Sequence, residues 1–298
     1  MSMSETKKAI AGVTLGRPKA ARHQVRFWAL QILVAVMFIA LSFAFLIPFY
    51  WMVVSSFKPV EDIFSLAFQF FPRRVTTVAY VELFTTKPFF RWFWNTFFMT
   101  AVHTAGTLLI SAMAGYALAK YQFKGSKTIF LIILASTMIP LHLRLIPLFL
   151  TLNAYRLINT YTGVILPTLA SSFSVFFMRQ FMLGIDSDLL EAGRIDGASE
   201  FRLFWNIALP LSKPALSALG VLTALNFWND LLWPLVVTRT PDMFPLAVGL
   251  ASMTSTYRPQ YHLLMAGSFL SVLPIIVAYF FARRTFTQGL AISSGLKG

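Results

Sequence analysis

The longest polar passage in the second half of this 298-residue chain is DSDLLEAGRIDGASEFRLFWNIALPLSKPAL, residues 186–216. It holds five of the eleven acidic residues, namely Asp186, Asp188, Glu191, Asp196 and Glu200. Small residues also recur in it: Ala192, Gly193, Gly197 and Ala198. Two interpretations are open on pattern alone. The passage is either a solvated connection whose charges confer solubility or, since a connection needs only a few residues, a surface that fits closely against another molecule.

A second candidate for chemistry is the sequence NFWND, which ends in Asp230 inside a long apolar segment. An unpaired charge in the middle of a membrane costs about 2.5–3.5 kcal/mol, so this carboxylate should face the protein interior or water. The neighbouring amides and aromatic rings suit a sugar, whose hydroxyls need hydrogen bonds and whose C–H faces stack on rings. These neighbours are Asn226, Trp228, Asn229 and Trp233. Helix packing with an interfacial tryptophan belt is an equal alternative.

Arg144 is the basic residue that we expect at a depth similar to that of Asp230. Each lies 16 residues from the start of its expected segment, roughly 24 Å along a helix at 1.5 Å per residue. One hypothesis is that the two side chains pair, directly or through water. The alternative is that Arg144 extends to the outer surface and Asp230 caps local backbone.

The sequence lacks the residues that several kinds of catalytic and binding chemistry require. The chain has no G-x-x-x-x-G-K-[ST] run to bind phosphates, and the segment GSKT at 125–128 lacks that spacing. No H-E-x-x-H sequence and no convincing Ser/His/Asp set is present, and the four histidines are scattered, so we read them as ordinary polar residues. The absence of cysteine excludes disulfides, iron–sulfur clusters and cysteine-ligated zinc. An intramembrane enzyme is therefore disfavoured, and we expect no catalytic residue, no metal and no cofactor in this chain.

The composition indicates a membrane protein. Hydrophobic residues make up 57% of the chain, charged residues only 12%, and the mean hydropathy is +0.69. The formal net charge of +14 would suggest nucleic acid in a soluble protein. In a membrane protein the same excess belongs to cytoplasmic loops, so we expect lipid contact and no nucleic-acid partner.

The apolar runs predict an all-α protein with six transmembrane helices. A span needs about 20 residues. The expected spans are about 27–54, 94–118, 128–150, 161–182, 214–237 and 262–282, with prolines at 140 and 147 breaking the third. Residues 1–26 and 283–298 are polar terminal tails, and residues 183–213 form the loop that contains the acidic passage.

The distribution of basic residues orients these spans. Sixteen of the 25 Lys and Arg residues fall on the side of the two tails and the 183–213 loop, and eight fall on the other side. Because positive loops stay in the cytoplasm, we expect both termini and the acidic passage to be cytoplasmic.

The acidic passage predicts two short helices. Asp186 or Ser187 can cap a helix over about 188–196, and Gly197 permits a sharp turn because glycine tolerates positive φ. Ser199 can cap a second helix that ends at Leu209–Pro210. Its expected apolar face consists of Phe201, Phe204, Ile207 and Ala208.

The sequence EAGRIDGASEFRLFWNIALPLSKPAL resembles the EAA loop of bacterial ABC-importer permeases. The matching positions are Glu191, Ala192, Asp196, Gly197, Ala198, Ile207, Leu209 and Pro210. Gly193 departs from the pattern, which commonly has alanine there. Other segments resemble the carbohydrate-uptake branch of this family, specifically the second subunit of maltose permeases. These segments are residues 47–59, 115–126, 177–182, 229–237 and 288–298.

The resemblance implies a type I ABC-importer permease fold, in which the EAA loop is a coupling helix seated on a cytoplasmic ATPase. Glu191 would face a basic group there and Gly197 would supply the bend. The C-terminal tail would touch the same ATPase through Gln288, Gly289 and Lys297.

The resemblance also implies the partners, which are a second related permease, two ATPase subunits that bind MgATP, and an extracytoplasmic solute-binding protein. The location would be the bacterial cytoplasmic (inner) membrane. The substrate would be a sugar, oligosaccharide, polyol or related compound, along a path that includes Asn226, Trp228, Asn229, Asp230 and Arg144. The alternative function is a secondary transporter or channel that works without an ATPase.

Overall fold

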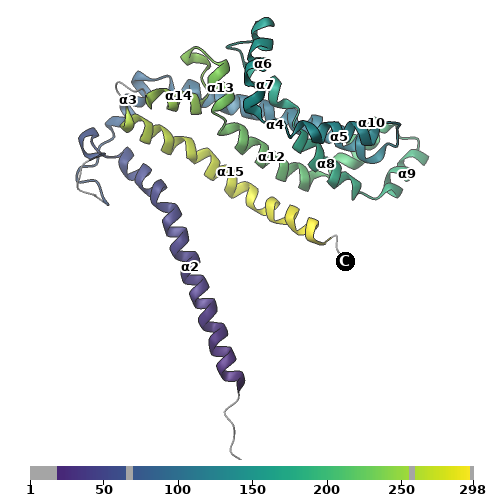
Figure 1. Cartoon of the computed structure of the whole chain (residues 1–298), viewed down its shortest axis with the longest axis horizontal. Coiled ribbons are helices and arrows are strands. Elements are labelled where there is room, and N and C mark those ends of the chain that lie inside the picture. Colours follow the sequence, from purple (N-terminus) through teal and green to yellow (C-terminus); the bar gives the residue numbers. More distant parts are fainter. Residues whose placement is uncertain (1–18, 65–69, 255–258, 296–298) are drawn as a thin grey trace, which may run out of the picture. The chain divides into compact units, whose positions relative to one another are not determined.

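The structure is a computed structural model that describes residues 19–64, 70–254 and 259–295. Within these ranges, residues 19–26, 141 and 281–295 are described by their backbone alone. Every regular element in these ranges is helical (Figure 1), as the apolar runs predicted. The first half contains α2 (Lys19–Ser56), η1 (Val60–Asp62), α3 (Val78–Thr86), α4 (Phe89–Lys120), α5 (Ser126–Ser136), α6 (Leu141–Ala154) and α7 (Tyr161–Leu169). The second half contains α8 (Ser172–Leu183), α9 (Ser187–Ile195), α10 (Glu200–Leu203), η2 (Phe204–Ala208), α11 (Leu209–Leu211), α12 (Lys213–Trp228), α13 (Leu232–Val237), η3 (Pro241–Met243), α14 (Leu246–Ala251), η4 (Ser252–Thr254) and α15 (Tyr261–Gly295).

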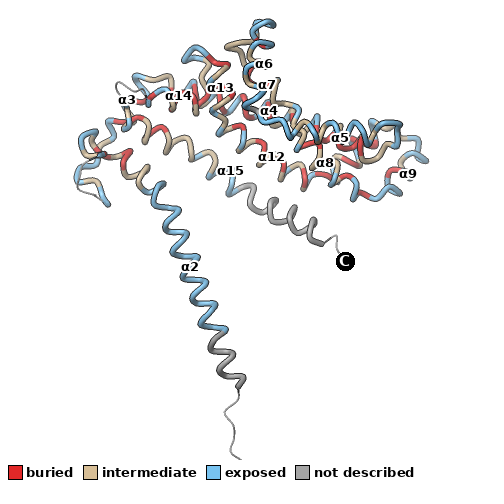
Figure 2. Tube along the Cα trace, in the orientation of Figure 1, coloured by how far each residue is buried: buried red, intermediate tan, exposed pale blue. Residues whose placement is uncertain are grey.

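The chain forms two compact units, residues 1–52 and 53–298. The first consists of most of α2, whose side chains from Phe27 to Tyr50 are exposed around the whole helix (Figure 2). A helix that is apolar on all faces is suited to lipid or to burial rather than to water. The apolar stretch of α2, Phe27–Ser56, has 30 residues, which is more than a span requires.

Two further helices are long and apolar enough to cross a membrane by themselves, α4 and the Tyr261–Phe280 part of α15. Two bent pairs would each add one span: α7 with α8, bent by 46°, and Glu200–Leu211 with α12, bent by 75°. The third expected span is two helices, α5 and α6. Pro140 separates them, whereas Pro147, which we expected to be a second break, lies inside α6.

Helix α4 organises the second unit. Its 32 residues would extend about 48 Å at 1.5 Å per residue. It contributes Trp92, Met99 and Tyr116 to three separate clusters of buried hydrophobic side chains. One face of α4 also buries polar residues: Asn95, Thr96, Thr100, His103, Thr107 and Ser111. Such groups need hydrogen-bond partners in an apolar bundle, and several find them at breaks in neighbouring helices.

Candidate functional site

The acidic passage folds as two short helices joined by a tight turn, as its sequence predicted. Asp186 caps α9, and its Oδ1 accepts from the backbone N–H of Asp188 at 3.0 Å. Gly197 ends α9 with φ +78°, a conformation that glycine adopts at little cost. The N–H groups of Ala198 and Gly197 donate to the carbonyls of Gly193 and Arg194, both at 3.0 Å. This pattern is the Schellman motif, which satisfies the free carbonyls at a helix end.

A side-chain network fixes the turn. The Arg194 guanidinium donates to Glu200 twice, from Nε to Oε1 at 2.7 Å and from Nη2 to Oε2 at 3.3 Å. The Tyr121 hydroxyl, just after α4, donates to Glu200 Oε2 at 2.6 Å. The hydrogen bond from Arg194 and, to a smaller extent, that from Tyr121 lower the pKa of Glu200. Burial and the hydrogen bond to Glu200 raise the pKa of Tyr121. The carboxylate therefore stays ionised and ties α9, α10 and the end of α4 together.

The inner face of the two helices is packed into the bundle. Leu190 of α9 and Leu203 of α10 are each 1% exposed and belong to one buried cluster with Met178 and Met182 of α8 and Tyr116 of α4. A displacement of α9 must therefore move side chains that also contact α4 and α8, because a close-packed core has little free volume.

The apolar face predicted for the second helix is correct for Phe204, Ile207 and Ala208 but wrong for Phe201. Phe201 is 68% exposed and lies with its ring 5.8 Å from that of Trp205, one turn later on the outer side. Leu203 is buried in its place. The helix register changes here because residues Phe204–Ala208 form a π-helical turn.

The predicted end at Leu209–Pro210 lies one residue before the observed end at Leu211, after which the chain bends by 75° into α12. Pro210 has no N–H to donate and its ring would clash with the carbonyl four residues earlier in a regular α-helix. The π-turn accommodates it: the Leu209 N–H donates five residues back, to Phe204.

The outer face of α9 is open. Glu191, Ala192 and Asp196 are exposed, and Ile195 is 86% exposed. Within the described part of the chain, Glu191 has neither a hydrogen bond nor an ion pair through its carboxylate. This helix therefore presents a carboxylate and apolar side chains together.

A second feature is the break between α7 and α8, which α4 stabilises. His103 Nε2 donates to the Thr168 carbonyl at 3.1 Å, and Thr107 donates to the Leu169 carbonyl at 2.9 Å. Both carbonyls lie at the end of α7, where the regular helix bonding stops. Polar residues in the middle of α4 thus supply the hydrogen bonds that an interrupted helix needs inside a membrane.

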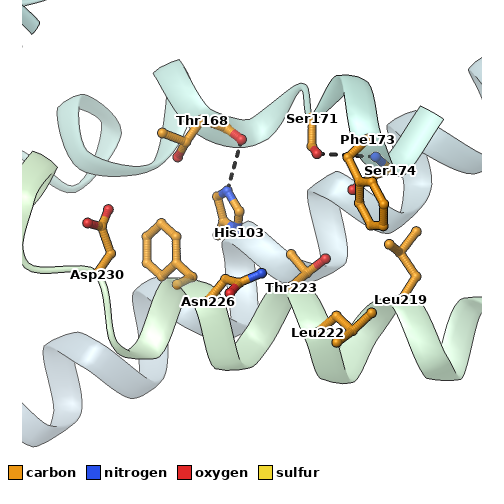
Figure 3. A pocket seen from close by; sticks show the side chains of 11 residues that line it. His103, Thr168, Ser171, Phe173, Ser174, Leu219, Leu222, Thr223, Asn226 and Asp230 are labelled. Atoms are coloured by element: carbon orange, nitrogen blue, oxygen red, sulfur yellow. Dashed lines mark hydrogen bonds between the residues drawn. The ribbon is translucent and has the colours of Figure 1, made fainter. Parts of the chain in front are cut away.

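A cavity of about 320 Å³ lies beside this break (Figure 3). Its lining comes from α4, α7, α8 and α12 and includes His103, Thr168, Ser171, Thr223 and Asn226. Asp230, just after α12, completes one end, and backbone N–H groups of Trp233 and Leu232 interact with its carboxylate.

The expected path residues are only partly brought together. Asn226 and Asp230 line the cavity, but Trp228 packs on Phe93 with ring centroids 5.8 Å apart. The Asn229 amide donates to the Leu225 carbonyl of its own helix at 2.8 Å. Arg144 is exposed on α6, and the ion pairs among the described residues do not include one between Arg144 and Asp230.

Other expectations lie outside the described side chains. Gln288 and Gly289 fall in the part of α15 that is described by backbone alone, and Lys297 lies outside the described residues. The helical backbone of α15 extends to Gly295, beyond the expected end of the last span at residue 282.

Sequence reasoning missed several residues that build these sites. Glu200 and Tyr121 have no pattern that marks them as partners, and His103 was read as an ordinary polar residue. The position of His103 in the middle of an apolar segment could have identified it, because a polar side chain inside a membrane requires a partner.

Comparisons with known proteins place these features in one family. The model of the family described as "binding-protein-dependent transport system inner membrane component" matches residues 106–288. The arabinooligosaccharides transport system permease protein AraQ of Bacillus subtilis is 39% identical over 280 residues, covering 93% of this chain and 99% of AraQ. The lactose transport system permease protein LacG of Rhizobium radiobacter is 30% identical over 249 residues, covering 84% of this chain and 90% of LacG.

The fold is also that of a solved transporter structure. A chain in the crystal structure of a bacterial ABC transporter involved in the import of the acidic polysaccharide alginate superposes with a TM-score of 0.80. The two sequences are 23% identical, and the match covers 92% of this chain and 100% of the other. With the family match and the relatives at 39% and 30% identity, the chain belongs to the binding-protein-dependent transport system inner membrane components, as a permease subunit of an ABC importer.

Proposed function

We propose that this chain is one of two related permease subunits that import a sugar, an oligosaccharide, a polyol or a related compound across the bacterial cytoplasmic membrane. An extracytoplasmic solute-binding protein delivers the substrate, and two cytoplasmic ATPase subunits bind MgATP and supply the energy. The substrate class is supported by two relatives named for arabinooligosaccharides and lactose. Because this chain has no phosphate-binding G-x-x-x-x-G-K-[ST] run, the proposal assigns ATP binding to the separate ATPase subunits.

The topology that we propose has six spans with both termini in the cytoplasm. The third span consists of α5 and α6, the fourth of α7 and α8, and the fifth begins with α12. The two-to-one bias of basic residues supports this orientation, because positively charged loops resist translocation.

The coupling surface that we propose consists of α9 and the turn after it. Glu191, Ala192 and Asp196 are exposed on α9, Gly193 allows its close approach to Leu203, and Gly197 and Ala198 form the turn. The observation that carries it is the division of α9 into two faces, since Leu190 is 1% exposed in the bundle core whereas Glu191 beside it is exposed. A force applied to the outer face by a closing ATPase would reach α4 and α8 through that core. A charge-assisted hydrogen bond of Glu191 to a basic group would contribute about 1.5–3 kcal/mol.

Reconstitution tests this function. Proteoliposomes that contain both permeases, with and without the ATPase subunits, are given a solute-binding protein loaded with arabinotriose, and uptake is measured with and without MgATP inside. Uptake only in the complete, ATP-supplied vesicles supports the importer. Equal uptake in vesicles without the ATPase would support the alternative, a secondary transporter or channel.

Cross-linking tests the coupling surface. The natural chain has no cysteine, so a single cysteine reports on one site. Ala192→Cys should cross-link to cysteines placed in the cleft of the ATPase, whereas Thr85→Cys, exposed on α3, should not. Failure of every Ala192→Cys pair in an active transporter would place the ATPase elsewhere.

A further inference from the structure

Among the described residues, the lining of the cavity beside the α7–α8 break contains an acidic side chain but no lysine or arginine. The acidic side chain is that of Asp230. The other polar residues of the lining are uncharged or histidine: His103, Thr168, Ser171, Ser174, Thr223 and Asn226. Figure 3 shows Asp230, Asn226 and Thr223 on the α12 side and Thr168 and Ser171 on the other, with His103 between them.

His103 is held as a fixed part of this wall. Its Nε2 donates to Thr168, and its ring stacks on Phe227 with centroids 4.2 Å apart and 22° between planes. A side chain held by both contacts keeps one rotamer, so the cavity is preorganised rather than collapsed. Preorganisation lowers the cost of ordering the site when a ligand binds.

Asp230 retains capacity to accept further hydrogen bonds. An ionised carboxylate has about four lone-pair sites, and the backbone N–H groups of Trp233 and Leu232 occupy only part of them. The residue is half-buried and lines the cavity. Its free acceptor sites would suit hydroxyl donors.

We infer that this subunit itself contributes a sugar subsite, in which the cavity holds one neutral sugar ring and Asp230 accepts from its hydroxyls. This inference rests on the proposed function and specifies its substrate class. The volume of about 320 Å³ lies near the lower end of the roughly 300–1,000 Å³ typical of small-molecule pockets, which suits one ring rather than a chain of rings. Leu222 and the exposed ring of Phe173 supply apolar surface for the C–H faces of the sugar ring.

The same geometry disfavours anionic sugars. A uronate or sugar phosphate in the cavity would place a second negative charge near Asp230 without a basic side chain from this wall. Like charges that lie close together repel, and such repulsion is a common source of specificity. The subsite therefore selects neutral sugars over acidic ones.

The absence of cysteine allows a direct test in the complete transporter in nanodiscs, with the other subunits also made cysteine-free. Leu222→Cys reports on the cavity, and Ser217→Cys, exposed on the same helix but outside the lining, is the matched control. Each is labelled with a cationic and with an anionic methanethiosulfonate. At Leu222→Cys the ratio of cationic to anionic labelling should fall at least about threefold when Asp230→Asn is added. The ratio at Ser217→Cys should not change.

Occupancy is tested by protection. Arabinotriose delivered by its binding protein during ATP-driven turnover should slow labelling at Leu222→Cys and leave Ser217→Cys unaffected. Asp230→Asn should raise the arabinotriose concentration for half-maximal uptake by about tenfold, because a hydrogen bond to a charged group is lost. Glu61→Gln, which removes an exposed carboxylate outside the lining, should leave it unchanged.

The outcomes separate the subsite from the function. Unchanged labelling at Leu222→Cys during active arabinotriose uptake would overturn the subsite and leave the importer intact. Equal labelling ratios with and without Asp230 would overturn the charge selection. A lack of ATP-dependent uptake of every sugar and polyol tested with the unsubstituted complex would instead contradict the proposed function.

Discussion

Arg194 and Glu200 are joined across the turn at Gly197 by two hydrogen bonds, with Nε 2.7 Å from Oε1 and Nη2 3.3 Å from Oε2. The pair links the last turn of α9 to the first turn of α10. Because Tyr121 donates to the same carboxylate, the turn is also tied to the end of α4. The acidic passage is therefore an ordered element, held at its centre by one of its own acids.

Glu200→Gln should affect coupling more than stability. The two side chains of the ion pair are 38% and 43% exposed, so solvent screening limits the loss of unfolding free energy to under about 1 kcal/mol. The looser turn should raise the ATP hydrolysed per sugar imported. Thermal unfolding of the purified complex and a paired measurement of hydrolysis and uptake check both effects.

The pH dependence of this pair follows from the sign of the pKa change. Glu200 has a pKa below its ordinary value of 4.5, so its contribution to stability is present above that value and is lost as pH falls through the lower folded pKa. The difference in stability between the natural chain and Glu200→Gln should be constant between about pH 6 and 8. A difference that disappears within that range would show that another group titrates in the network.

Gly193→Ala should weaken the loop even though alanine favours helix by up to about 1 kcal/mol. A Cβ at this position would lie 2.5 Å from Leu203 Cδ2 and 3.3 Å from Ile207 Cδ1. Leu203 is 1% exposed in the core, so it has little room to move, and overpacking typically costs about 1–3 kcal/mol. We expect a net loss of stability together with weaker coupling.

Thr85→Ser is the control for Gly193→Ala, because it also changes one methyl group, at an exposed position on α3 outside the coupling surface. A second test is the double variant with Leu203→Val, which should recover part of the loss. If Gly193→Ala stabilises the complex, helix propensity outweighs packing and glycine at this position is not required for close approach.

The sequence predicted those features of the loop that depend on neighbouring residues. The caps at Asp186 and Ser199 and the turn at Gly197 each follow from local backbone chemistry, and the structure has all three. Phe201 was misplaced because a π-turn changes the helix register after it, and such a turn has no period that a pattern can reveal. The role of Gly193 depends on Leu203, ten residues later, and becomes visible only in the packed structure.

The cavity was even less accessible to sequence reasoning. Asn226 and Asp230 were marked by their polarity in an apolar segment, but Trp228 and Asn229 between them face other groups. His103 and Thr168 lie on different helices and are 65 residues apart in the chain. Residues so far apart are brought together by helix packing, which local patterns do not encode.

Arg144 and Asp230 should act independently in transport. In the structure Asp230 interacts with local backbone N–H groups and Arg144 is exposed, which fits the alternative to pairing. Each single charge reversal, Arg144→Asp and Asp230→Arg, should reduce uptake, and the double reversal should not restore it. Rescue by the double variant would show that the two side chains pair in the assembled transporter.

The central claim is that the outer face of α9 transmits ATPase closure to the membrane bundle, and Glu191→Lys tests it most directly. Glu191 is exposed, so its replacement should leave folding intact, with Glu61→Lys as a control for reversing an exposed acid elsewhere. ATP hydrolysis and arabinotriose uptake are measured in the same proteoliposomes. The account predicts a folded complex in which uptake falls at least about tenfold, as expected for loss of about 1.5–3 kcal/mol of docking energy, and hydrolysis no longer responds to the loaded binding protein. Normal coupled uptake by Glu191→Lys would contradict it.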